Sequence, residues 1–336
     1  MKKILKARET TSFLFLAALF LLVGIINPSF LTLSNISACF NTSVVYTLIA
    51  VGMAFAIFVG EIDVSVGSNL GLVAAVVGTM IQNGSNWFAA FAVGICIGAV
   101  VGLINGWGVA VMKIPSLIFT LGTNGILRGM MYLQVGAEQV NQLPKAFKDI
   151  SSMTLVGSFT IYYCCAVLLT LLIHALLTRT RKGRYFIAVG DNAGGAELVG
   201  IPAIRTKVLA YVICGVLCAV AGILFASRAG QVTSQSGNGY EMKAVAACVL
   251  GGISLSGGVG SVVGAGIGAV IMASISALLV FMGFSSNFDS AITGVILITI
   301  VVVDALVQRR AAVRNRHARL AARTTARTGG KEAAEQ

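Results

Sequence analysis

From Thr10 to Met112 the chain carries only two charged side chains, Glu61 and Asp63, in otherwise apolar sequence. A charged side chain in hydrocarbon costs about 2.5–3.5 kcal/mol on insertion scales, so each carboxylate must reach water or serve a purpose. Charged residues make up 11% of the 336 residues, and the mean hydropathy is +0.91. Soluble domains contain about 25% charged residues. The sequence therefore predicts an all-α polytopic membrane protein.

Windows without charge clusters can be counted as membrane crossings, because a spanning helix needs about 20 residues. Three windows have room for two crossings each, and four windows have room for one. The windows with two are 10–60, 64–112 and 244–288, and those with one are 114–135, 150–178, 208–227 and 290–308. We therefore expect about ten transmembrane helices.

The positions of Lys and Arg predict the orientation, since cytoplasmic loops carry an excess of basic residues. With the N-terminus inside, nineteen basic residues fall on the cytoplasmic side and four fall outside. The four outside are Lys145, Lys148, Arg228 and Lys243. Both termini are thus expected in the cytoplasm, with residues 1–308 as the transmembrane domain and 309–336 as a basic cytoplasmic tail.

Two segments share a pattern, GEIDVSVGS (60–68) and GGISLSGGVGS (251–261). Each follows an apolar run and precedes a run rich in glycine and alanine. Duplicated halves are common in transporters, where broken helices handle substrate near the repeat interface. Chance similarity of Gly-Ser-rich loops is the alternative. We favour an internal two-fold repeat with halves of about 35–135 and 207–308, parallel because both copies turn at the same side.

The first copy places polar groups inside apolar sequence. Gly60 and Gly67 are expected to loosen the helix, which leaves backbone groups to be satisfied by protein or by a water-filled cavity. Asp63 and Ser65 would suit such a cavity. Asp63 can instead cap the next helix, because Asp and Ser are good N-caps, and we favour this use. Ser254 stands at the position of Asp63 in the second copy, so the structural role does not need a charge.

The segment RTRKGRYFIAVGDNAGGAELVGIPAIRTK (179–207) is the longest polar interruption of the core. Asp191 and Asn192 are N-cap residues, and GIP at 200–202 is a stop signal, so a helix of about two turns is expected over 193–199. Such a helix is too short to be stable alone in water. A short helix at the membrane surface is suited to serve as a docking site for another protein. An ordinary connecting loop is the alternative.

Several separated motifs resemble one family. GEIDVSVGS, KIPSLIFTLG, GDNAGGAELVGI and YEMKAVAACVLGGISLSGGVGS are similar to motifs of the permeases of bacterial ATP-binding-cassette (ABC) importers for ribose-type sugars. That group takes up ribose, xylose, rhamnose and autoinducer-2, and the resemblance covers about 35–308. RGMMY, GDN and the basic tail look closest to an autoinducer-2 permease, with rhamnose permeases next. Gly194 and Gly195 depart from the family, which places bulkier helix formers there.

The resemblance implies a transport subunit, not an enzyme, in the bacterial inner (cytoplasmic) membrane. The family works as two permease subunits, identical or paralogous, in the lipid bilayer, with two cytoplasmic ABC ATPase domains, a periplasmic sugar-binding protein and no nucleic acid. The chain lacks the sequence G-x-x-x-x-G-K-[ST], so ATP and Mg are expected on the partner ATPase. No cofactor, metal ligand or catalytic residue is expected here. The coupling helix that inserts into the ATPase would comprise Gly190, Asp191, Asn192, Ala196, Glu197, Leu198, Gly200 and Ile201.

A polyhydroxyl solute needs a path of hydroxyl, amide and backbone groups. The candidates for this path are Asp63, Ser65, Ser68, Thr120, Thr123, Asn124, Ser254 and Ser256. Each of them can instead make an interhelical hydrogen bond. Arg128, inside the fifth crossing, either pairs with a carboxylate or snorkels outward. The residues that could engage the binding protein outside are Glu138, Arg228, Glu241 and Lys243.

Two other classes of protein remain as alternatives. An ion-coupled secondary transporter would use Asp63, or Glu61, as its proton or sodium site, and its activity would be abolished by uncouplers. A membrane-embedded enzyme would need His174 or a cysteine as its reactive group. His174 has no carboxylate nearby in the sequence, which disfavours catalysis.

Overall fold

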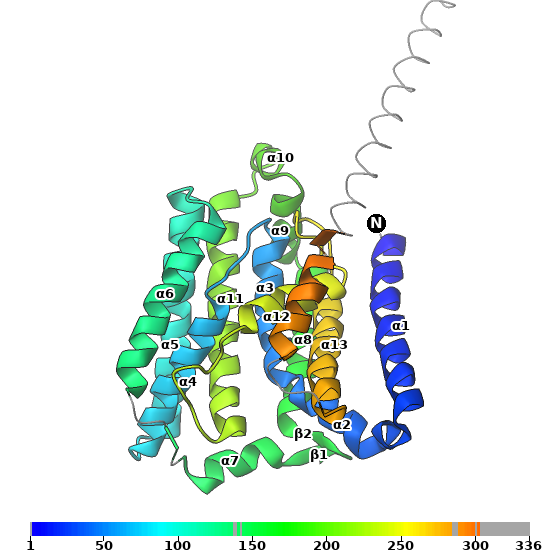
Figure 1. The fold of residues 1–336 in the computed structure, drawn as a ribbon. Helices are drawn as coiled ribbons and strands as arrows, with labels where there is room; N and C mark the ends of the chain where they lie inside the picture. The colour runs from blue at the N-terminus through cyan, green and yellow to red at the C-terminus, as the bar shows by residue number, and fades with distance from the viewer. Residues whose placement is uncertain (1, 137–139, 142, 284–287, 300, 303–336) are drawn as a thin grey trace, which may run out of the picture.

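The computed structural model describes residues 2–136, 140–141, 143–283, 288–299 and 301–302. The predicted basic tail (309–336) and Glu138 lie outside these residues. The described part is a bundle of helices with one short hairpin, and Figure 1 shows α10 at one end of the bundle and α7 at the other. We call these the α10 end and the α7 end.

The elements follow one another from the N-terminus in this order. The first half contains α1 (Lys2–Ile26), the 3₁₀ turn η1 (Pro28–Leu31), α2 (Leu33–Thr42), α3 (Val44–Phe58), α4 (Val66–Gln82), α5 (Trp87–Gly106), the π-helical turn η2 (Trp107–Val111) and α6 (Ser116–Val135). The second half contains α7 (Lys145–Ser152), β1 (Thr154–Val156), β2 (Phe159–Thr160), α8 (Ile161–Arg179), α9 (Arg181–Asp191), α10 (Ala193–Leu198), α11 (Ala203–Ala229), α12 (Tyr240–Leu250) and α13 (Val262–Phe281). A further helix runs over Phe288–Thr299.

Within the described residues, four helices are long and apolar enough to cross a membrane. They are Trp87–Val111, Ile161–Arg179, Ala203–Ala229 and Val262–Leu279. A fifth crossing results if α2 and α3, which are bent by 42°, count as one. Shorter apolar helices are Thr10–Ile25, Val66–Gln82 and Phe288–Thr299. The protein is thus a polytopic all-α membrane protein, and the count of ten crossings stays a prediction.

Two predicted windows differ from the structure. The window 150–178 was expected to be one helix, but it begins with the end of α7 and the β1–β2 hairpin, so α8 starts only at Ile161. The window 244–288 does contain two helices. The first of them, α12, has 11 residues, which is too short to span a bilayer alone. It ends at Leu250 with Gly251 as its C-cap, and Gly252 takes a left-handed conformation at φ 82°.

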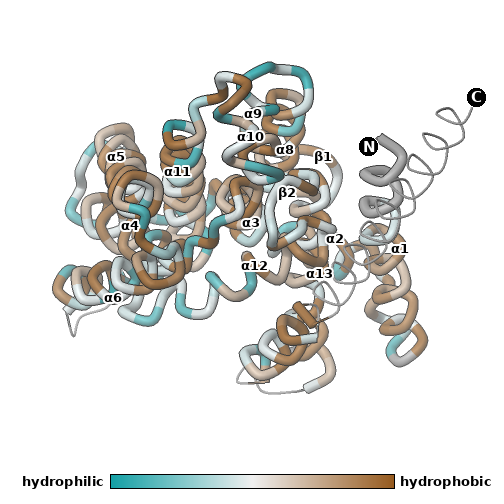
Figure 2. Tube along the Cα trace, turned by 90° about the horizontal axis from the view of Figure 1, so that it is seen from above, coloured by the Kyte–Doolittle hydropathy of each residue, from teal (hydrophilic) through white to brown (hydrophobic). Residues whose placement is uncertain are grey.

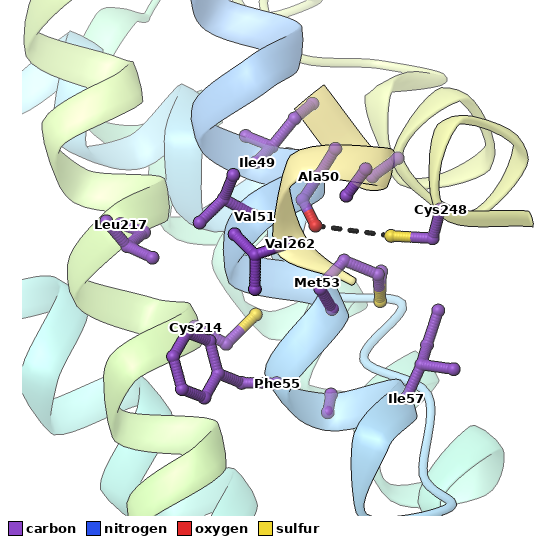
Figure 3. Packing of buried hydrophobic residues seen from close by; sticks show 14 of the residues in the cluster. Ile49, Ala50, Val51, Met53, Phe55, Ile57, Cys214, Leu217, Cys248 and Val262 are labelled. Carbon is purple, nitrogen blue, oxygen red and sulfur yellow. Dashed lines mark hydrogen bonds between the residues drawn. The ribbon is translucent and has the colours of Figure 1, made fainter. Parts of the chain in front are cut away.

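The helix α3 forms the centre of the bundle. All of its 15 residues are buried, as expected for a helix that is apolar on every face. Figure 2, seen from the α10 end, shows α3 surrounded by α8, α9, α11, α12 and α13. Figure 3 shows part of this packing, with the Cys248 thiol of α12 donating to the Ala50 carbonyl at 3.2 Å.

The helices α5 and α11 pack through glycine. Gly98, Gly102 and Gly106 recur at every fourth position of α5 and face α11. A Cβ at Gly102 would lie 2.4 Å from the carbonyl oxygen of Tyr211, and one at Gly98 would lie 2.4 Å from that of Gly215. Small residues at this spacing allow two membrane helices to approach backbone to backbone.

A buried ion pair connects α12 to the helix at 288–299. Lys243 is 8% exposed, and its ammonium pairs with the Asp289 carboxylate. It also donates to the hydroxyls of Ser276 at 3.2 Å and Tyr46 at 3.3 Å. The expectation that Lys243 faces outward to a binding protein is therefore wrong, because the residue links α12 to α3, α13 and the helix at 288–299 inside the bundle.

We expect Lys243→Met to lower the free energy of unfolding by about 3 kcal/mol, because it leaves the partly buried Asp289 without its counter-charge. The measurement is thermal unfolding of the purified chain in detergent. The double variant K243M/D289L removes both charges and should recover part of the loss. A double variant no more stable than K243M would contradict this account of the pair.

Candidate functional site

The predicted short helix of the polar loop is present as α10. The Asn192 side chain caps it by accepting from the backbone N–H of Gly195 at 2.8 Å. At the other end Gly200 adopts φ 82°, its N–H donates to the Glu197 carbonyl at 3.0 Å, and the N–H of Ile201 donates to the Ala196 carbonyl at 2.9 Å. These two bonds form a Schellman motif. The sequence prediction of a helix over 193–199 is confirmed.

The tip of this loop is apolar and exposed. Leu198 is 89% exposed and Val199 is 75% exposed, whereas Ala196 is buried. Glu197, Asp191 and Asn192 are also exposed. Two adjacent exposed apolar side chains at the tip of a projecting helix form a surface suited to contact with another protein.

The helix α9, which precedes α10, was not predicted. Its buried residues Gly183, Phe186 and Val189 recur every third position, a helical spacing that could have revealed it. Its last residues reach the centre of the bundle. A Cβ at Gly190 would lie 1.7 Å from the carbonyl oxygen of Phe58 and 2.6 Å from the amide nitrogen of Gly258.

The two related motifs form two breaks between helices. The first break (59–65) joins α3 to α4, and the second break (251–261) joins α12 to α13. The N–H of Gly258 donates to the carbonyl of Phe58, the last residue of α3, at 3.0 Å. A Cβ at Gly257 would lie 2.8 Å from the Gly60 nitrogen, so the two breaks contact each other directly. We call Phe58, Gly190 and Gly258 the junction. It connects both breaks with the end of α9, while the internal repeat itself stays a prediction.

The carboxylates of the first break have separate structural partners. Glu61 forms an ion pair with Lys207 of α11 at 2.5 Å. Asp63 is 2% exposed, and its Oδ1 accepts from the N–H and the hydroxyl of Ser65 at 2.9 and 2.6 Å. The side-chain amide of Asn105 donates to Ser65 at 2.8 Å and to Asp63 at 3.3 Å. Asp63 therefore stabilises the turn before α4, although the N-cap residue is Ser65.

The other candidates of the two breaks have different exposures. Ser68 is fully buried and donates to the carbonyl of Ser65 at 2.9 Å. Ser254 is buried and Ser256 is exposed, both in the second break. Gly67 was expected to loosen a helix, but it lies within α4, where a Cβ would be 2.2 Å from Glu241 Oε2 and 2.4 Å from the carbonyl of Gly237. Gly67 therefore allows α4 to pack closely against Gly237 and Glu241.

One face of α6 carries a polar side chain at every fourth residue. The residues of this polar face are Ser116, Thr120, Asn124, Arg128 and Tyr132. Four of them contact neighbouring segments. The Ser116 and Thr120 hydroxyls accept from the N–H groups of Ile62 and Val64 at 3.5 and 3.1 Å. Arg128 Nη1 donates to the Ser236 carbonyl at 2.8 Å, and Tyr132 accepts from Gln235 at 2.8 Å.

Sequence reasoning identified Thr120 and Asn124 but missed the four-residue spacing that joins them to Arg128. Arg128 forms no direct ion pair with a described carboxylate, although it interacts electrostatically with Glu241, and its Nη1 donates to the Ser236 carbonyl. Thr123 points elsewhere. It lines an apolar groove of about 760 Å³ between α5 and α6, and its hydroxyl donates to the carbonyl of Phe119 at 3.2 Å.

Comparison with known proteins gives consistent matches over most of the chain. Residues 35–301 match the family described as "Branched-chain amino acid transport system / permease component". The autoinducer 2 import system permease protein LsrC of Enterobacter sp. (strain 638) is 40% identical over 305 residues, 90% of this chain and 88% of that protein. The LsrC protein of Yersinia pseudotuberculosis serotype O:1b (strain IP 31758) is 38% identical over 327 residues, 97% of this chain and 93% of that protein.

A third relative, the LsrC protein of Klebsiella pneumoniae subsp. pneumoniae, is 37% identical over 306 residues, with 90% of this chain and 88% of that protein covered. No solved structure matches the chain. Since the family match extends over most of the sequence, this polytopic helical chain belongs to the branched-chain amino acid transport system permease component family.

Proposed function

We propose that this chain is the membrane-spanning permease subunit of an ABC importer and translocates autoinducer 2 or a similar small furanosyl solute. The relatives at 36–40% identity carry autoinducer 2 import in their names, and they align over about 90% of the chain. In this proposal a periplasmic binding protein delivers the solute, a second permease completes the path, and two ATPase domains supply the energy. The chain itself hydrolyses no ATP.

The observation that carries the proposal is the connection from α10 to both breaks. Leu198 of α10 and Val199 directly after it are exposed, and the helix before α10 ends at the junction, where Gly190 touches Phe58 and lies beside Gly258. A displacement of α10 by a bound protein would therefore reach the breaks through one short helix. We infer that the α10 end faces the cytoplasm and that the ATPase docks on residues 190–201.

The ion pair between Glu61 and Lys207 supports the same transmission of movement from α10 to the first break. Lys207 lies in the first turns of α11, directly after the loop that carries α10, and Glu61 lies in the first break. The pair thus joins the far side of the α9–α10 loop to the break that begins directly after Phe58, the residue that Gly190 contacts. The loop is therefore held on one flank at Glu61 of the first break and on the other at Phe58, next to that break, so a movement of α10 can reach it.

We expect Leu198→Asp to abolish co-purification with the partner ATPase and to reduce ATP-dependent solute uptake at least tenfold. The reason is that a charged group replaces an apolar side chain at the centre of the docking surface. The charge reversal Glu197→Lys should act in the same direction. The measurements are pull-down of the ATPase and uptake into proteoliposomes that contain the whole importer.

Leu155→Asp is the matched control, because Leu155 is 61% exposed on β1 at the α7 end. It should keep the ATPase bound. Equal loss of ATPase in both variants, or full binding by Leu198→Asp, would contradict the docking assignment. Uptake of labelled autoinducer 2, compared with ribose, xylose and rhamnose, tests the solute, and uptake without any ATPase would overturn the importer proposal.

A further inference from the structure

Three buried polar atoms on α6 and α12 lack a hydrogen-bond partner among the described residues. They are Asn124 Oδ1, Arg128 Nη2 and Glu241 Oε2. A buried polar atom without a partner costs about 1–3 kcal/mol, and more when it belongs to a charged group. Such atoms are rare in native structures and call for a water, an ion or a ligand.

These atoms lie near one another. Arg128 donates a hydrogen bond to the Ser236 carbonyl oxygen. This oxygen lies against α4, because it would be 2.5 Å from a Cβ added at Gly71. Glu241 Oε2 would be 2.2 Å from a Cβ at Gly67, one turn earlier on the same helix. One helical turn separates positions by about 6 Å along the axis. Asn124 lies one turn from Arg128 on the polar face of α6.

The spacing leaves room for a hydroxyl group. A hydroxyl that accepts from Arg128 Nη2 and donates to Glu241 Oε2 makes two hydrogen bonds of about 2.8 Å, which together span a gap of one helical turn. Asn124 Oδ1 accepts from a second hydroxyl. The guanidinium and the carboxylate cancel in charge, so an uncharged solute gains hydrogen bonds without a net field that would trap an ion.

The position in the bundle fits passage across the membrane. Arg128 lies twelve residues into α6, about 18 Å from its start at Ser116. A cavity of about 260 Å³ adjoins Glu241, and its other lining residues are apolar and include Ile62 and Val64 of the first break and Leu255 of the second. A solute leaving Glu241 on this side would enter a space bounded by both breaks and without polar side chains that would hold it.

We propose that Asn124, Arg128 and Glu241 form a transit site for the hydroxyl groups of an uncharged polyhydroxyl solute. This inference rests on the proposed importer function and assigns its path to α6 and α12. Asp63 and Ser65 are then structural, because Ser65 and Asn105 already satisfy the Asp63 carboxylate. Glu241 belongs to the path inside the bundle and not to a surface for the binding protein.

The first test is uptake by the complete importer in proteoliposomes, with autoinducer 2 and ribose as probes. Arg128→Gln and Glu241→Gln should each reduce uptake about tenfold or more, the loss expected for a hydrogen bond to a charged group. ATP hydrolysis and ATPase binding should persist. Asp149→Asn, an exposed carboxylate on α7, is the matched control and should transport normally. Uptake at the rate of the unmodified chain by both variants would overturn the proposal.

The second test does not depend on transport or on removal of a charge. Asn124→Cys should react with a small, hydrophilic, membrane-impermeant thiosulfonate, and ribose or autoinducer 2 at high concentration should slow the reaction. Peptide mass spectrometry locates the label, and the native Cys218 and Cys248, both fully buried, should stay unmodified. An unreactive residue 124 in the folded complex would overturn the site. If the unmodified importer takes up neither solute, the proposed function fails, while labelling at residue 124 still decides for or against a water-filled site.

Discussion

Gly190→Ala is expected to abolish solute uptake, although it adds a single methyl group. The added Cβ would lie 1.7 Å from the Phe58 carbonyl oxygen and 2.6 Å from the Gly258 nitrogen, far inside contact distance. Both atoms belong to the backbone, and the Gly258 N–H donates a hydrogen bond to the Phe58 carbonyl, so neither can move without breaking the contact between the second break and the end of α3. The end of α9 must then withdraw from the junction. We expect the α10 loop to bind the ATPase while its movement no longer reaches the breaks.

Uptake and ATP hydrolysis by the reconstituted importer measure this effect together. Uptake should fall more than tenfold while ATP hydrolysis continues. Gly194→Ala is the matched control in the same loop, because a Cβ there meets only Asn192 Oδ1 at 3.7 Å, and alanine favours the helix. Normal transport by Gly190→Ala, or an equal loss in Gly194→Ala, would show that the junction does not transmit the movement.

Gly102→Ala should destabilise the whole bundle, because it separates α5 from α11. The new methyl group would lie 2.4 Å from the carbonyl oxygen of Tyr211 and 2.7 Å from the Cα of Val212. Overpacking typically costs about 1–3 kcal/mol, and we expect the upper end because both contacts are to backbone atoms. Thermal unfolding in detergent and the yield of monodisperse protein measure this loss.

Gly125→Ala on α6 is the control for this substitution, since a Cβ there has nothing within 4 Å. It should leave the melting temperature unchanged or raise it slightly, as alanine is the better helix former. If both variants unfold at the temperature of the unmodified chain, then α5 and α11 do not depend on the glycine contact, and the packing described above is wrong for the protein in detergent.

Much of the helical architecture was predictable from local pattern. The Asn192 cap and the stop at Gly200 are decided by residues within a few positions of each other, so the sequence was sufficient to place α10. The length of α12 was harder to predict, because the apolar run around Gly251 gives no sign of how soon the chain turns. The burial of Lys243 was also hidden, since its counter-charge, Asp289, lies 46 residues away in sequence.

The candidate residues of the translocation path also divide into those that the local sequence identifies and those that depend on distant contacts. Thr120 and Asn124 could be chosen as polar residues in an apolar helix, but which polar groups are already satisfied depends on distant segments. The sequence leaves both a capping role and a place on the path open for Asp63, because it does not show that Asn105, from another helix, donates to its carboxylate. Arg128 and Glu241 are candidates because each has a buried polar atom without a hydrogen-bond partner among the described residues. Such an atom can be recognised only when the positions of its neighbours in the folded structure are known.

The shortness of α12 also bears on how the chain enters the bilayer during synthesis. A helix of 11 residues is too short to span the hydrocarbon core of a bilayer, and the unpaired backbone N–H and C=O groups at its ends must be satisfied by surrounding protein. It packs against α13, which follows it in the chain, and against α3, where Cys248 contacts Ala50, 198 residues earlier. We therefore expect α12 to integrate against protein made both before and after it, with α3 already present and α13 following, and not directly into lipid.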